Sequence, residues 1–276
     1  MAFRLILLDR NAVIAVKKNI NGEEVEIKRL CELRKLDKQR HFISPILSMI
    51  EGQSGRREST QELESTLEKE SEAIGSFFKR ARTDTAFFKN TKNSRAFSDI
   101  FSNHIEHAWE HYISFIKNVQ ISLYQPVSPR ERLNVENLLF ALAEEHEVQV
   151  SHPVLLVALA VLYGHKGARK VMEPKPNYKT TDLEQEAAYN VVSDLIVISR
   201  LGQIRLVMSE GERNYSYVKF FTFDKGLSSV LKAIKINSEK SLSSGGVSLK
   251  ISCHRSLFPD LDDQNWYRLQ KALGIE

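Results

Sequence analysis

Two acidic residues directly follow apolar runs and could act together in catalysis. Asp9 follows Phe3–Leu8, and Asp224 follows Val218–Phe223. Both runs have the length and composition of buried strands, and open parallel α/β sheets bind ligands beyond the carboxyl ends of their strands. The sequence therefore predicts that the two carboxylates lie at one functional edge. An Asp at such a position also serves simply as a helix N-cap, and this alternative stays open for each residue taken alone.

A third and a fourth acid come from segments predicted to be helical. Glu186, Asn190 and Asp194 recur every four residues in a helix expected over Asp182–Leu201, so they form one stripe. Most of their neighbours are apolar, and an unpaired carboxylate near buried surface is costly. The stripe is either part of a metal site or a polar edge that faces water. Glu51 ends an apolar helical segment and is uninformative by itself.

These four acids would create an environment made of oxygen ligands only. Mg²⁺ and Mn²⁺ are hard cations that prefer carboxylate, carbonyl and water oxygens. A bound cation would also offset the repulsion between clustered carboxylates. The sequence therefore predicts a metal site built from Asp9, Glu51, Asp194 and Asp224.

The segments that carry these acids resemble the motifs of PIN-domain nucleases. Leu7–Ile14, which reads LLDRNAVI, resembles the opening motif, and Ile43–Glu51, ISPILSMIE, resembles the second. Asp194 stands where the third acid of the family lies. Phe221–Leu227, FTFDKGL, resembles the fourth motif, with Thr222 two residues before its acid. The order Asp, Glu, Asp, Asp matches the family, and the resemblance covers about residues 3–51 and 132–235.

The resemblance implies a fold, a reaction and a cofactor. The fold is α/β, with a Rossmann-like, mostly parallel sheet flanked by helices. The activity is that of a metal-dependent endoribonuclease, with RNA favoured over DNA, in a toxin, a defence effector or an RNA-processing enzyme. One or two Mg²⁺ or Mn²⁺ ions polarise the phosphodiester, activate water and stabilise the leaving oxygen, so no side-chain nucleophile is needed. The residues that would support the ligands or position water are Asn11, Asn190 and Thr222.

Other functions remain open beside this one. A PIN-like module without activity would bind nucleic acid or a partner protein, and a scaffold built on the helical region would expose an apolar patch there. Haloacid-dehalogenase-like phosphatases also begin with an Asp at a strand end, but they place a second Asp two residues later, where this chain has Asn11. A homodimer and an inhibitory partner protein are the protein partners that fit the resemblance.

The long separation of the second and third motifs predicts an insertion. Residues 1–58 and 130–236 are expected to form the nuclease core, 59–129 a helical insertion, and 237–276 a C-terminal strand and helix. Strands alternating with helices favour a mostly parallel sheet. The further strands that we expect are His41–Ser44, His146–Val150, Ile204–Met208 and Val247–Cys253.

A basic, aromatic segment lies within the expected insertion. Phe77–Phe97 holds five Phe and six cations against the single acid Asp84, in a chain whose net charge is only +4. Cations interleaved with aromatic rings suit single-stranded nucleic acid, whereas the alternative is a helix pair whose Phe side chains form a local core. The cations are Lys79, Arg80, Arg82, Lys89, Lys92 and Arg95.

Two smaller clusters allow a functional or a plain structural interpretation. His104, His107 and His111 share one helical face, which suits either a zinc site or histidines that border a packed surface. A second basic cluster is either a binding surface or a solvated loop. Its members are His165, Lys166, Arg169 and Lys170.

Composition places the chain among cytoplasmic proteins. The two cysteines, Cys31 and Cys253, cannot build a disulfide framework and fit a reducing compartment. The longest apolar run, Val154–Tyr163, is too short for a bilayer crossing and suits a buried helix. We therefore expect no membrane partner.

Overall fold

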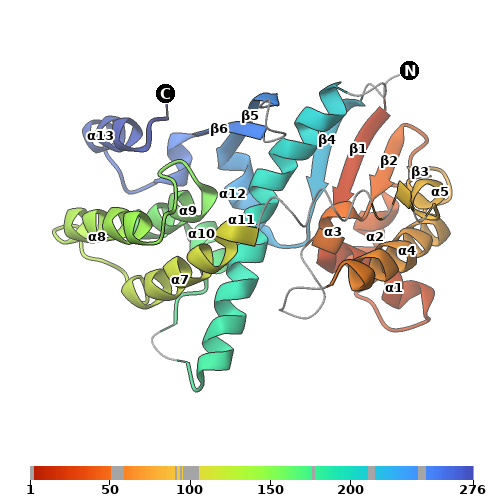
Figure 1. The fold of residues 1–276 in the computed structure, drawn as a ribbon, viewed down its shortest axis with the longest axis horizontal. Coiled ribbons are helices and arrows are strands. Elements are labelled where there is room, and N and C mark those ends of the chain that lie inside the picture. The colour runs from red at the N-terminus through yellow and green to blue at the C-terminus, as the bar shows by residue number, and fades with distance from the viewer. Residues whose placement is uncertain are drawn as a thin grey trace. The chain divides into compact units, whose positions relative to one another are not determined.

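The computed structural model describes residues 3–50, 59–90, 92–93, 95, 106–175, 178–210, 215–241 and 247–275 (Figure 1). The chain forms two compact units, each described by itself below. The first contains Met1–His104 and Ile204–Phe223, and the second contains Ile105–Gln203 and Asp224–Glu276.

The first unit is built on a four-stranded parallel sheet. Its strands are β1 (Phe3–Leu8), β2 (His41–Ser44), β3 (Arg82–Thr83) and β4 (Tyr215–Phe221), in the order β3-β2-β1-β4. They lie side by side in Figure 1. The chain moves outward from β1 through β2 to β3, whereas β4 pairs with the opposite side of β1. The expected α/β fold with a parallel sheet is therefore confirmed, and the strand order reverses between β1 and β4.

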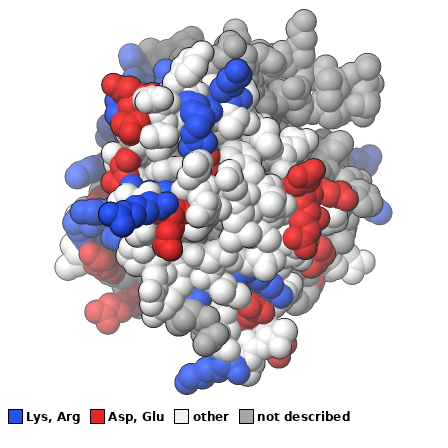
Figure 2. Space-filling model, turned by 90° about the vertical axis from the view of Figure 1, so that its left-hand side faces the viewer, with Lys and Arg blue, Asp and Glu red and all other residues white. Residues whose placement is uncertain are grey.

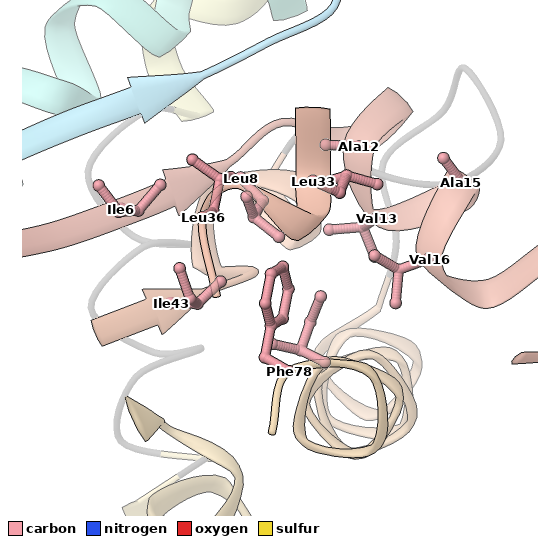
Figure 3. Close-up of a cluster of buried hydrophobic side chains, with 11 residues drawn as sticks. Ile6, Leu8, Ala12, Val13, Ala15, Val16, Leu33, Leu36, Ile43 and Phe78 are labelled. Carbon is pink, nitrogen blue, oxygen red and sulfur yellow. The ribbon is translucent and has the colours of Figure 1, made fainter. Parts of the chain in front are cut away.

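Helices cover one face of this sheet, on which β1 and β2 present apolar side chains. Ile6 and Leu8 of β1 point into the same cluster as Ile43 of β2, as the period of two in a strand requires (Figure 3). The cluster is completed by α1 (Arg10–Ile20), α2 (Ile27–Arg34) and α4 (Thr60–Phe77). Each fully buried aliphatic side chain there contributes about 1.5–3 kcal/mol of transfer free energy. Two short helices complete the unit, α3 (Ile46–Ile50) and α5 (Thr85–Phe88).

The second unit is mainly helical and is centred on one buried helix. Every residue of α9 (Pro153–Leu162) is buried, which confirms the interpretation of this apolar run as a core helix. An ion pair between Arg268 and the buried Glu136, which also accepts a hydrogen bond from Tyr163, ties the last helix to the unit. Its other helices are α7 (Glu106–Ser122), α8 (Arg132–Glu145), α10 (Lys166–Met172), α12 (Lys225–Ala233), η1 (Arg255–Leu257) and α13 (Asp263–Leu273). Helix α11 (Thr181–Glu210) belongs to this unit as far as Gln203. The strands β5 (Ile234–Ser241) and β6 (Val247–Cys253) form an antiparallel hairpin.

Two expected strands are wrong. Residues 146–150 form the turn between α8 and α9, where Glu147 adopts a φ of 52°. The stretch Ile204–Met208 continues α11, which runs through Gly202 instead of ending there. A helical glycine costs about 1 kcal/mol relative to alanine, and burial of Leu201 and Ile204 on either side of it outweighs that cost.

The compact units also differ from the expected division at 58, 129 and 236. Within the range 59–129, expected to be wholly helical, β3 pairs with β2 in parallel. Ile74 of α4 and the following Phe78 belong to the core of the sheet. Residues 59–104 therefore fall in the first unit, whereas residues 130–203 of the expected core fall in the second. No helix among the residues that the structure describes is long and apolar enough to cross a membrane.

Candidate active site

The carboxyl ends of the four strands bring polar side chains to one edge of the first unit. Ser44 ends β2, Asp9 directly follows β1, Asp84 directly follows β3, and Thr222 directly follows β4. In open α/β sheets, ligands bind at this edge where the strand order reverses. Here the reversal lies between β1 and β4, which places Asp9 and Thr222 at the position favoured for a ligand.

Asp9 and Thr222 are in direct contact. The Asp9 side chain is 4% exposed. Its Oδ1 accepts a hydrogen bond from the Ala12 main-chain N–H at 2.7 Å, and its Oδ2 accepts one from the Thr222 hydroxyl at 2.5 Å. Asp9 is therefore the N-cap of α1, but capping uses only one of its two oxygens. Thr222, expected from the sequence to support the ligands or position water, thus contacts the carboxylate of Asp9.

Asp224 caps a helix of the second unit. Its Oδ1 accepts a hydrogen bond from the Leu227 main-chain N–H at 2.8 Å, at the start of α12. This helix packs closely on α10, since a Cβ at Gly226 would lie 2.9 Å from the main-chain oxygen of Gly167. The close crossing brings the Lys170 side chain next to Gly226. The second basic cluster therefore lies on a packed helix and not in a loop: His165 is the N-cap of α10, and Lys166, Arg169 and Lys170 belong to the helix.

The remaining predicted ligands and their supporting residues lie in different surroundings. Asp194 is half-buried among buried apolar residues of α11, whereas Glu186 and Asn190 on the same stripe are exposed. Asn11 is exposed in the first turn of α1. Glu51 lies outside the described residues. Among the residues that are described, no three His, Cys, Asp or Glu side chains form a group that could hold a metal ion.

Asp84 is a buried acid that the sequence did not single out. It is 7% exposed, and burial raises its pKa to about 7 although the Ser44 hydroxyl donates a hydrogen bond to it. Its Oδ1 is buried without a hydrogen-bond partner. The sequence signal for Asp84 was its position as the single acid in a basic segment. The strand before it has only two residues, which is too short to be recognised from a sequence pattern.

A second buried acid, Glu70 of α4, lies in the same unit. It is 3% exposed and accepts a hydrogen bond from the Ser48 hydroxyl at 3.0 Å. The Lys17 ammonium lies 3.8 Å from its other oxygen. A carboxylate with these two partners is already compensated within the fold, so Glu70 is better explained by the packing of α4 against α1 and α3 than by ligand binding.

The six cations of the basic segment are exposed, but two of them contact neighbours in the protein. The Arg82 guanidinium lies over the Phe3 ring at 4.3 Å, and the Lys89 ammonium lies 3.3 Å from the Glu72 carboxylate. Phe78 and Phe88 are each 3% exposed, so their rings fill the core and are not open for base stacking. The other four cations are Lys79, Arg80, Lys92 and Arg95, and Phe97 lies outside the described residues.

Among the three histidines of the expected zinc face, the structure describes the side chain of His111. Its Nδ1 lies 3.2 Å from the main-chain oxygen of His146 and 3.7 Å from the Glu147 carboxylate. These contacts suit a histidine that tethers α7 to the turn after α8. His104 and the side chain of His107 lie outside the described residues.

Comparisons of the chain with models of protein families, with curated proteins and with solved structures found no match.

Proposed function

We propose that this protein is a metal-dependent nuclease that hydrolyses phosphodiester bonds, with RNA favoured over DNA. The observation that carries the proposal is the Asp9 carboxylate, buried at the strand-order reversal and oriented by the Thr222 hydroxyl. The resemblance of the surrounding motifs to those of PIN-domain nucleases supports the reaction type.

Capping of α1 does not by itself account for the burial of Asp9. Asp262 caps α13 in the same way, with its Oδ1 accepting from the Asn265 main-chain N–H at 2.8 Å, and it is exposed. Burial of a carboxylate costs free energy that an exposed cap avoids. Two hydrogen bonds fix the orientation of the Asp9 carboxylate. A buried carboxylate of fixed orientation is the kind of ligand that a hard cation needs.

In this proposal the Asp9 carboxylate is one of the oxygen ligands of Mg²⁺ or Mn²⁺. A bound ion would polarise the scissile phosphate and lower the pKa of a water molecule. Thr222 then acts as a positioning residue that fixes the rotamer of Asp9.

Cleavage assays with an internal control test the proposal. Labelled RNA and DNA are incubated with the protein in Mn²⁺, Mg²⁺ or EDTA, and the Asp9→Asn variant is compared with Asp262→Asn. Both changes keep a good N-cap residue and remove one carboxylate charge. We expect cleavage by the unmodified chain and by Asp262→Asn with either metal, and none by Asp9→Asn.

Undiminished cleavage by Asp9→Asn, in a preparation free of other nucleases, would refute the assignment of Asp9. Binding of RNA without cleavage in any metal would instead indicate a module without activity. Circular dichroism and thermal unfolding of each variant verify that the fold is retained.

A further inference from the structure

The second unit contains a pocket of about 180 Å³ lined by three cationic side chains. Arg132 stands at the start of α8, whereas Lys166 and Arg169 belong to α10. One carboxylate, that of Asp260, also lines the pocket. Figure 2 shows one face of the molecule, on which Lys and Arg side chains lie beside Asp and Glu side chains. In the lining of the pocket, cations outnumber carboxylates.

Arg132 is held in place by an ion pair but keeps a donor without a partner. Its Nη2 donates to Asp260 Oδ2 at 2.6 Å. Gly164, at a φ of +84°, makes room for this carboxylate, since a Cβ there would lie 2.6 Å from Asp260 Oδ2. The Nε of Arg132 is buried and makes no hydrogen bond. A buried guanidinium N–H without an acceptor is costly, and an oxyanion in the pocket would satisfy it.

His165 supplies a second donor of defined orientation. It is 9% exposed, and its Nδ1 accepts a hydrogen bond from the Ala168 main-chain N–H at 2.9 Å. Because a main-chain N–H can only donate, the neutral ring must carry its proton on Nε2. Arg169 donates to the main-chain oxygens of Leu123 and Tyr124, which fixes the wall of the pocket while its positive charge remains.

The size and the apolar lining of the pocket limit what it can hold. Pockets for drug-sized ligands measure about 300–1,000 Å³, so 180 Å³ suits a terminal group of a larger molecule. Gln125 and Gly164 also line the pocket, and five apolar side chains there would contact the carbon part of an ester. They are Leu123, Pro126, Val127, Val161 and Leu162.

We infer that this pocket binds a phosphate monoester, either the terminal phosphate of a nucleic-acid strand or that of a free nucleotide. A monoester carries about two negative charges at neutral pH, which complements three cations and one carboxylate. An internal phosphodiester would have to enter and leave with chain on both sides, for which a pocket of this volume gives no room. The nucleic-acid form of the ligand rests on the proposed function, whereas the phosphate site does not.

Binding is measured by fluorescence anisotropy in EDTA, so that no cleavage is needed. Single-stranded RNA is labelled internally and carries a 5′-phosphate, a 3′-phosphate or hydroxyls at both ends. Unlabelled adenosine monophosphate and inorganic phosphate serve as competitors. The variants are Lys166→Gln and Arg132→Gln, with Lys232→Gln as the control, because Lys232 is an exposed lysine of the same unit that does not line the pocket.

We expect one phosphorylated strand to bind about tenfold more tightly than the hydroxyl strand, the factor for one charge-assisted hydrogen bond. Lys166→Gln should remove most of this preference and leave affinity for the hydroxyl strand unchanged, whereas Lys232→Gln should keep the preference. Competition by adenosine monophosphate as strong as that by the strand would identify a free nucleotide as the ligand. Arg132→Gln leaves Asp260 unpaired, so circular dichroism checks its fold, and Lys166→Gln decides the test if it misfolds.

Equal affinity for all three strands, together with no competition by adenosine monophosphate, would overturn the inference, as would an unchanged preference in folded Lys166→Gln. These outcomes are independent of catalysis. A preference for the phosphorylated strand without cleavage would support the phosphate site and contradict the proposed nuclease activity. Cleavage without such a preference would support the nuclease activity and contradict the phosphate site.

Discussion

Replacement of Asp84 by Asn should stabilise the metal-free protein at pH 8 and have little net effect on its stability at pH 5. Asp84 is 7% exposed, its Oδ1 is buried without a partner, and burial raises its pKa to about 7 against an ordinary 3.8. Between these two values the folded chain holds a proton on Asp84 that the unfolded chain has lost. Stability therefore falls as pH rises from about 4 to about 7, and is level above that.

The size of the effect follows from the pKa difference. One pKa unit corresponds to about 1.4 kcal/mol, so an ionised Asp84 costs the fold about 4 kcal/mol above pH 7. Asn has nearly the same shape and no charge, but its amide needs partners that only Ser44 offers in part, which costs about 1–3 kcal/mol. We therefore expect a net gain of about 1–3 kcal/mol at pH 8. At pH 5 the cost of the buried acid is lower by about 2.6 kcal/mol, so the gain there is near zero or becomes a small loss.

Urea unfolding in EDTA at both pH values measures this gain, with Asp37→Asn as the matched control. Burial raises the pKa of Asp37, but hydrogen bonds from the main-chain N–H groups of Lys79, Arg80 and Ala81 outweigh it and lower the pKa overall. Asp37 is thus ionised at both pH values, and its replacement should destabilise equally at each. A destabilised Asp84→Asn at pH 8, or the same change at both pH values, would refute the reasoning.

Three further outcomes follow from the same structure. Cleavage should occur with Mg²⁺ or Mn²⁺ and fail with Ca²⁺, whose larger radius and looser coordination do not organise an in-line attack; cleavage after exhaustive chelation would contradict this. Replacing Lys89, Lys92 and Arg95 by Gln should lower the log–log salt slope of RNA binding by up to about 2, as binding titrations at several salt concentrations would measure, since each single-strand phosphate contact contributes about 0.7. His152 stacks on Tyr112, and burial lowers its pKa to about 4. The free energy of unfolding should therefore decrease by up to about 3 kcal/mol as the pH falls from 6.5 to 4, because only the unfolded chain is protonated at this residue in that range. A His152→Gln variant whose denaturation shows the same pH dependence between 6.5 and 4 would contradict this last prediction.

Local patterns in the sequence were sufficient for the elements that carry strong periodic or capping signals. The apolar run before Asp9 predicted β1, the run from Val154 predicted a fully buried helix, and the alternation in Val247–Cys253 predicted β6. Each of these signals is contained in fewer than a dozen neighbouring residues. The N-cap geometry of Asp9 belongs to the same class, because it follows from what the adjacent residues can bond.

Long-range pairing decided the rest. Arg82 and Thr83 form β3 only because β2 offers a free edge, and that pairing is what delivers Asp84 to the edge that carries Asp9. Gly202 predicted a helix end, but burial on either side of it carries α11 onward to Glu210. In both places the free energy comes from contacts between residues far apart in the chain, which a local pattern cannot register. The sequence by itself therefore determined the strand, the helix cap and the acid at position 9, whereas only the tertiary structure decided which other acid lies buried on the same edge.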